Sequence, residues 1–151
     1  MKKLLILAVL LVAIIIPVTA ADTNGKDLGV GLSLGFPIVN LTAKYDLEQE
    51  FAVCGGLGFG GGILKISGGA QYNFMDFSIE KLEFNVYAGG NIFIAFGNSK
   101  FGLGLDLILG TSHYLDDPSL EIFVDTGINV DLLSFQVGGL FGIGARYELD
   151  M

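Results

Sequence analysis

From residue 27 onward, large apolar side chains alternate with small, polar or charged ones. Successive side chains of a strand point to opposite faces, so a period of two predicts β-strands. Eight such stretches follow one another, and none of the chain after residue 26 has a helical period. The last stretch shows the alternation best, with these apolar positions: Phe135, Val137, Phe141, Ile143, Ala145, Tyr147, Leu149 and Met151.

Turn residues separate the predicted strands. Pro37 and the triplet Gly60–Gly62 are typical of tight turns, and Met75–Glu80 is expected to be the longest connection. Four large side chains interrupt the alternation by falling among the polar positions: Phe93, Ile108, Phe123 and Leu140. We expect strands near 27–36, 39–47, 51–59, 64–74, 82–96, 101–112, 120–130 and 135–151.

The first 20 residues have the pattern of a secretory signal peptide. Lys2 and Lys3 precede an apolar run that is short for a membrane-spanning helix, and small residues follow it. We therefore expect a helical signal peptide over 1–20, with cleavage after Ala20; an uncleaved membrane anchor is the alternative. Residues 21–26 would then be a polar lead-in, and 27–151 a single domain.

The charge balance is acidic. The whole chain has 8 basic and 16 acidic residues, and loss of Lys2 and Lys3 with the signal leaves 6 against 16, a net charge of −10. A chain without a basic patch is a poor candidate for binding nucleic acid or for docking on anionic lipid by charge. Cys54 is the only cysteine, so an internal disulfide is excluded, and we expect it to be a small filler.

Volume favours an apolar face that points outward. Eight strands with about five apolar residues each carry roughly 40 such side chains, more than the narrow interior of an eight-stranded barrel can hold. The opposite face is largely Gly, Ser, Asn and Thr, which suits a crowded lumen. Closure also removes the unpaired edges that lipid cannot satisfy. The sequence predicts an all-β, antiparallel, up-and-down transmembrane barrel of eight strands; a soluble barrel or sandwich is the alternative.

Charge placement points the same way. When each strand is phased by its large apolar residues alone, nine charged residues fall on the opposite face, away from lipid. A basic residue facing lipid at the bilayer midplane costs about 2–4 kcal/mol, so a membrane barrel needs this segregation. The predicted lumen charge cluster consists of Lys44, Asp46, Lys65, Glu83, Asp106, Glu121, Asp125, Arg146 and Glu148.

The chain resembles the small eight-stranded outer-membrane barrels of Gram-negative-type bacteria, such as the transmembrane domain of outer-membrane protein A, and an uncharacterised group of short-turn barrels. The matching stretches are Gly35–Ile38, Leu41–Tyr45, Leu120–Phe123 and Gly142–Leu149. The resemblance implies an integral protein of the bacterial outer membrane. It supplies no catalytic residues.

The C-terminus resembles the signal that the barrel assembly machinery reads. Gly144, Tyr147 and Leu149 have the spacing of that signal, while Met151 replaces its usual final aromatic residue. The resemblance implies that the assembly machinery is a partner during biogenesis.

The lumen charges allow two interpretations. They form either a plug of ion pairs that satisfy one another or a polar conduit that binds a small cation. Eight-stranded barrels are normally filled, so we expect the plug, with Arg146 at its centre because a guanidinium can hold two carboxylates. The set contains six acids against three bases, which suggests that some carboxylates lie at the rims in water or stay protonated.

Other chemistry has weak support. Ser112 and His113 are neighbours in a strand and must point to opposite faces, so they cannot form a hydrolase dyad without a bulge. Asp116 and Asp117 with Asp131 suggest calcium, but acids in turns are usually solvated. No helix follows the glycine runs, so none is expected to hold a phosphate. We predict no metal site and no cofactor.

Topology completes the picture. If both termini of the chain lie in the periplasm, the turns that face the cell exterior are all short and offer little surface for recognition. We expect a monomeric, non-enzymatic outer-membrane barrel with a structural or envelope-integrity role, surrounded by outer-membrane lipid. A narrow pore for small solutes is the second hypothesis, and a soluble lipocalin-like carrier the third.

Overall fold

The computed structural model describes residues 28–48, 50–97, 100–116 and 118–149. The signal peptide with Ala20, the lead-in over 21–26, and Met151 lie outside them. The described residues form eight strands: β1 (Leu28–Phe36), β2 (Val39–Asp46), β3 (Phe51–Gly60), β4 (Ile63–Ile79), β5 (Leu82–Gly97), β6 (Lys100–Asp116), β7 (Ser119–Asp131) and β8 (Gln136–Leu149).

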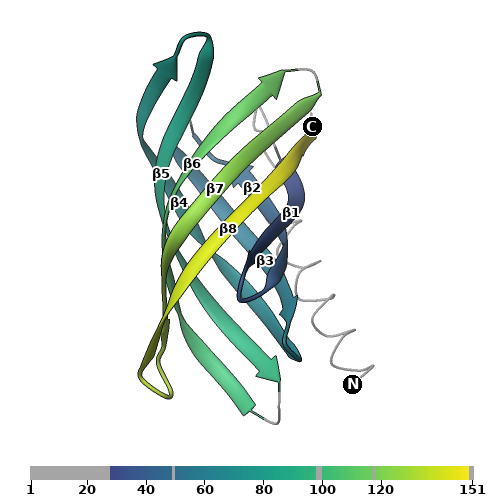
Figure 1. Cartoon of the computed structure of the whole chain (residues 1–151), viewed down its shortest axis with the longest axis vertical. Helices are drawn as coiled ribbons and strands as arrows, with labels where there is room; N and C mark the ends of the chain where they lie inside the picture. Colours follow the sequence, from purple (N-terminus) through teal and green to yellow (C-terminus); the bar gives the residue numbers. More distant parts are fainter. Residues whose placement is uncertain (1–27, 49, 98–99, 117, 150–151) are drawn as a thin grey trace.

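The strands close into a barrel. Each pairs antiparallel with the next, and β8 returns to β1 in a register that runs from Leu28↔Leu149 to Phe36↔Phe141 (Figure 1). This confirms the predicted eight-stranded, antiparallel, up-and-down barrel. Among the described residues, no helix is long and apolar enough to cross a membrane.

The apolar face points outward. Ile92 of β5 is 61% exposed and Leu107 of β6 is 52% exposed, whereas Lys44, Asp106 and Arg146 are buried inside. A water-soluble barrel would show the reverse arrangement, so the hypothesis of a lipocalin-like carrier is wrong. A closed wall with an apolar exterior and a polar interior is the architecture of outer-membrane barrels, and the protein is an integral membrane barrel of this bacterial type.

The barrel has two distinct ends. The terminal end carries Leu28 and Leu149 together with the β2–β3, β4–β5 and β6–β7 turns, and the far end carries the other four turns (Figure 1). The wall is uneven in length, since β2 has 8 residues and β4 has 17.

One predicted connection is wrong. Met75–Glu80 is not a loop, because β4 continues to Ile79 and pairs with β5 as far as Ile79↔Leu82. A register shift between Asn73 and Met75 marks a bulge at Phe74. The bulge moves the alternation by one residue, and this interruption hides the continuing strand from a search for period two.

Candidate functional site in the barrel lumen

The inward side chains gather around Glu121 at the terminal end of the lumen. Glu121 lies on β7 and is 1% exposed. Its Oε1 accepts from Lys44 Nζ at 3.1 Å and from the Tyr114 hydroxyl at 3.0 Å, and its Oε2 accepts from Arg146 Nη1 at 2.8 Å. Lys44 Nζ also donates to the Tyr114 oxygen. We call Lys44, Tyr114, Glu121 and Arg146 the Glu121 cluster; it joins β2, β6, β7 and β8.

Glycine on β1 makes room for the arginine of this cluster. Gly31 is paired with Arg146 on one side and with Thr42 on the other. A Cβ at Gly31 would lie 2.6 Å from the Arg146 Cα, which is too close for any side chain. Over this glycine, Arg146 Nε reaches Thr42 Oγ1 on β2 at 3.3 Å.

The expected centre of the cluster is therefore corrected. The sequence predicts that Arg146 holds two carboxylates; in the described contacts its guanidinium donates to the Glu121 carboxylate and to the Thr42 hydroxyl. The carboxylate instead sits between two cations, Lys44 and Arg146. The reason is register: Glu121 and Arg146 are direct partners on β7 and β8, and closure through β1 brings Lys44 to the other carboxylate oxygen.

A second group of charges lies nearer the far end. Lys65 Nζ on β4 is 2.6 Å from Asp106 Oδ2 on β6, and Asn129 Nδ2 on β7 donates to Asp106 Oδ1 at 2.7 Å. Between the two groups, the Tyr87 hydroxyl donates to Asp125. Glu121, Asp125 and Asn129 are four residues apart on β7, so they line one row of inward positions.

Each lumen cation also lies over an aromatic ring. Arg146 Cζ is 3.8 Å from the ring centroid of Phe123, Lys65 Nζ is 4.1 Å from that of Phe93, and Lys44 Nζ is 5.0 Å from that of Tyr114. Ring faces attract cations, more strongly where water is excluded. These rings belong to the site, and the sequence interpretation did not include them.

The inward rings in turn lie against glycines of the next strand. Phe123 is paired with Gly144, and a Cβ at Gly144 would be 2.5 Å from the Phe123 Cζ. Phe93 with Gly104, and Tyr87 with Gly110, repeat this arrangement. Two of the four residues that broke the alternation, Phe93 and Phe123, are thus explained. An inward aromatic paired across strands with glycine is the signal that could have found them.

Glu83 does not belong to the lumen. It is exposed on the β4–β5 hairpin, beyond the first β5–β6 pair at Asn85↔Ser112. Its parity was predicted correctly, but β5 extends past the barrel there. Asp46 lies at the rim, with its side chain 30% exposed and Oδ1 3.3 Å from Lys44 Nζ, and Glu148 is half-buried one residue from the end of β8.

These placements resolve the predicted acid excess. Without Asp46, Glu83 and Glu148, the predicted set contains three acids and three bases in the interior. The remaining charges are Asp106, Glu121, Asp125, Lys44, Lys65 and Arg146. Within this set the interior is neutral, as a low-dielectric environment requires.

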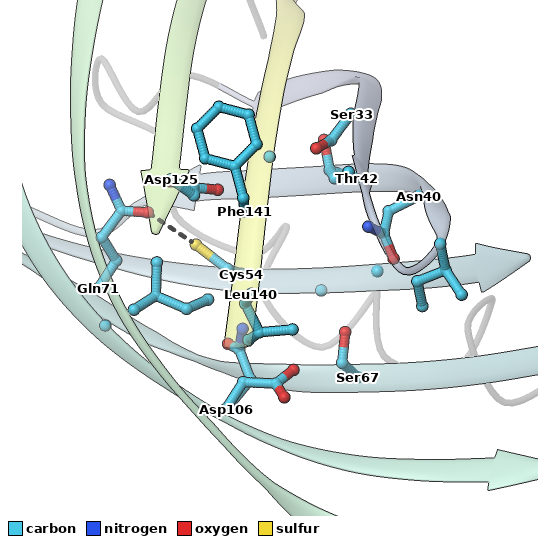
Figure 2. A pocket seen from close by; sticks show the side chains of 18 of the residues that line it. Ser33, Asn40, Thr42, Cys54, Ser67, Gln71, Asp106, Asp125, Leu140 and Phe141 are labelled. Carbon is cyan, nitrogen blue, oxygen red and sulfur yellow. Dashed lines mark hydrogen bonds between the residues drawn. The ribbon is translucent and has the colours of Figure 1, made fainter. Parts of the chain in front are cut away.

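A cavity of about 120 Å³ occupies the lumen, and Ser33, Gln71 and Asp106 are among the residues that line it (Figure 2). Its lining runs from Arg146 to Gly35 and Phe36 at the β1–β2 turn and includes no other member of the Glu121 cluster. Gln71 reaches into this region and is 5% exposed. Its Oε1 accepts from Cys54 Sγ at 3.3 Å, and its Nε2 has no hydrogen-bond partner among the described residues. The cavity thus ends at the Glu121 cluster.

Ser112 and His113 do not form a catalytic pair. Ser112 is buried on the inward face, while the His113 ring lies 5.2 Å from that of Phe84 on the outward face. Its Nδ1 is 2.6 Å from the Glu83 carbonyl oxygen, on the hairpin and away from the lumen. The prediction that the two residues point to opposite faces is confirmed.

The suggested calcium ligands are also separated. Asp116 is at the terminal end and Asp131 at the far end of the barrel, and Asp117 lies outside the described residues. Asp131 Oδ1 accepts from the backbone N–H groups of Leu133 and Ser134 at 2.8 and 2.9 Å, so it closes the β7–β8 turn. Within 28–48, 50–97, 100–116 and 118–149, no group of three metal-binding side chains occurs.

The C-terminal residues divide between the two faces. Tyr147 and Leu149 are exposed on the outward face, and Gly144 faces inward beneath Phe123. Two of the apolar members of the predicted assembly signal thus lie on the outward surface. Their role in assembly stays a prediction.

Comparison with known proteins gives matches in structure alone. No family model and no curated sequence matches the chain. Neisserial surface protein A (NspA) has a TM-score of 0.48 and 16% identity, over 82% of this chain and 94% of its own. Ail, the attachment invasion locus protein of Yersinia pestis, has a TM-score of 0.41 and 13% identity, over 82% and 96%.

The structure of the Yersinia pestis outer membrane protein Ail in a phospholipid bilayer nanodisc also matches. Its TM-score is 0.41 and its identity 16%, over 82% of this chain and 98% of that one. Nothing about function transfers to this chain at similarity of this degree.

Proposed function

We propose that this protein is a non-enzymatic outer-membrane barrel with a closed lumen and a structural role in the integrity of the cell envelope. The observation that carries the proposal is the Glu121 cluster. One carboxylate, 1% exposed, accepts hydrogen bonds from side chains of three other strands and so fills the lumen at the terminal end.

The cluster suits a permanent plug better than a gate. Removing one partner from a buried ion pair costs about 3–5 kcal/mol, because the other charge is left without compensation. Here Lys44 and Arg146 are both paired with Glu121, and the Phe123 ring covers the guanidinium. An opening that separates these groups would expose all three charges at once.

Lipid of the outer membrane is the proposed surrounding of the barrel, and the assembly machinery its partner during biogenesis. The turns of the far end that lie within the described residues are short: two residues join β1 to β2 and two join β3 to β4. Such turns offer little surface for a receptor or adhesin. We accordingly propose a monomer that acts through its place in the membrane.

A narrow pore is the second candidate, and the cavity on the far side of Arg146 is the observation that favours it. Single-channel recording in planar bilayers separates the two. The wild-type protein is expected to give no discrete current steps; regular openings would overturn the closed lumen.

A matched pair of variants sharpens this recording. Glu121→Ala/Arg146→Ala removes the plug without changing net charge and is expected to produce current steps. Glu48→Ala/Lys81→Ala makes the same charge change at exposed residues and should give no current steps.

The envelope role is tested in cells. Cells that lack the protein should become more sensitive to detergent, and wild-type protein should restore resistance. Unchanged sensitivity would contradict that role.

A further inference from the structure

The β4–β5 hairpin rises beyond the barrel wall at the terminal end (Figure 1). The β3–β4 pairing ends at Phe51↔Tyr72, and the β5–β6 pairing begins at Asn85↔Ser112. Between these limits, and within the part of the chain that the structure describes, residues 74–84 have strand pairing only between β4 and β5. We call this segment the ribbon.

The ribbon has one apolar and one polar face. The cross-strand pairs Met75↔Val86, Phe77↔Phe84 and Ile79↔Leu82 place their apolar side chains on the outward side. The Phe77 and Phe84 rings stack with centroids 5.2 Å apart. The opposite face carries Asp76, Ser78 and Glu83.

The bulge at Phe74 creates this arrangement. Tyr72 points outward and Asn73 inward, so an unbroken alternation would turn Met75 and Phe77 toward the inward side. Because of the extra residue, Met75 and Phe77 point outward, to the same side as the lipid-facing residues of β4 within the barrel wall. The apolar face of the ribbon is therefore continuous with the lipid-facing surface of β4 and β5.

The strands that carry the ribbon are taller than the apolar core of the membrane. At about 3.3 Å per residue and a tilt near 40°, the 16 residues of β5 span about 40 Å of height, against about 25 Å for the apolar band of such barrels. By the same estimate, the 8 residues of β2 span about 20 Å. The wall formed by β4 and β5 is thus taller than the hydrocarbon region, and the ribbon is its terminal end.

We propose that the ribbon is a lipid-binding element that lays Met75, Phe77 and Ile79 into the boundary between headgroups and acyl chains. Ile79 is 57% exposed and Leu82 is 49% exposed, so the face is open to a partner. Lipid is the occupant because the same face contacts lipid along the rest of both strands. The ribbon would thus bind the membrane interface in the way that amphipathic helices usually do.

Charge indicates which lipid the ribbon binds. It carries Asp76, Glu80 and Glu83 against Lys81, three acids to one base. An acidic element gains nothing from anionic headgroups, so the binding rests on apolar area and should be insensitive to salt. Zwitterionic phosphatidylcholine is therefore sufficient as a probe.

The absence of tryptophan from the chain allows a direct test. Phe77→Trp places a single fluorophore on the apolar face, and Ser78→Trp is the matched control on the polar face. Each variant is folded into phosphatidylcholine vesicles, and folding is checked by the shift in gel mobility on heating. The quenchers are lipids brominated near the headgroup and acrylamide in the water.

We expect blue-shifted emission from Phe77→Trp, strong quenching by bromine, and severalfold weaker quenching by acrylamide than for Ser78→Trp. Equal acrylamide quenching of both variants would overturn the proposal. So would shielding that appears only at high protein density together with cross-linked dimers, because a second copy would then cover the face. Ile79→Trp repeats the measurement should Phe77→Trp not fold. These variants do not change the lumen, so a negative result for the ribbon would not contradict the proposal of a closed lumen.

Discussion

Glu121 and Arg146 are direct partners on neighbouring strands, and the guanidinium Nη1 lies 2.8 Å from the carboxylate Oε2 inside the barrel. The Phe123 ring covers the guanidinium, with its centroid 3.8 Å from Cζ. Lys44, from the other side of β1, holds the second carboxylate oxygen. One buried carboxylate is therefore shared by two cations from the strands on either side of β1.

Glu121→Gln should destabilise the folded barrel by about 3–5 kcal/mol, because the buried Arg146 loses its carboxylate partner and Lys44 keeps only Asp46 at the rim, while the shape of the side chain is kept. The measurement is urea unfolding of the protein in vesicles, followed by gel mobility without heating. Glu48→Gln, a change at an exposed turn carboxylate, is the control and should leave the midpoint unchanged. Equal urea midpoints for both variants would show that the Glu121 carboxylate does not stabilise the cluster.

Gly144→Ala should destabilise the barrel by about 1–3 kcal/mol, because the added methyl would overlap the Phe123 ring and the Leu32 carbonyl oxygen. Gly138→Ala is the matched control on the same strand and the same face, since a Cβ there meets nothing within 4 Å. Urea unfolding compares the two. Should Gly144→Ala instead slow assembly in cells while its unfolding midpoint stays normal, Gly144 acts in the assembly signal and not in packing.

Lys65 and Asp106 should be energetically coupled, since their 2.6 Å contact joins β4 to β6 across β5. A double-mutant cycle with Lys65→Met and Asp106→Leu is expected to give a coupling energy of about 0.5–3 kcal/mol. Each single change leaves the other member of the pair as a buried charge without its partner. The double variant should therefore lose less stability than the sum of the two single losses. Simple additivity would mean that water or another group compensates each charge.

The two faces of the wall should respond differently to a new cation. Leu105→Arg or Ile128→Arg places charge on the outward face and should cost about 2–4 kcal/mol near the midplane, which impairs membrane assembly. Ser67→Lys points into the cavity instead and should be tolerated better. Recovery in the outer-membrane fraction, with heat-dependent gel mobility, measures assembly. Equal recovery of all three variants would contradict the assignment of the faces.

The strands and their phase could be predicted because alternation is a local property of each strand. Closure follows from the same pattern, since eight strands that face lipid on one side cannot leave an edge unpaired. For this reason the inward position of Asp106 or Asp125 could be anticipated from parity alone.

The partners of those charges could not be predicted. Lys44 and Glu121 are 77 residues apart, and their contact depends on the stagger between strands at closure, which no single strand encodes. The bulge at Phe74 reverses parity within β4 and so concealed the ribbon that carries Glu83 outside the lumen. The inward position of Phe123 could not be predicted from β7 alone, because the glycine that makes room for its ring, Gly144, lies on β8.

The difference in length between β2 and β5 has an effect on the membrane itself. Lipids next to the short strand β2 must compress, at a cost of a fraction of a kcal/mol per ångström of mismatch, whereas β5 is long enough to cross the full hydrocarbon thickness. Each barrel is thus surrounded by a gradient of bilayer thickness with a fixed direction. Two barrels that turn their short sides toward each other share one thinned region, so the elastic bilayer can orient neighbouring molecules that never touch.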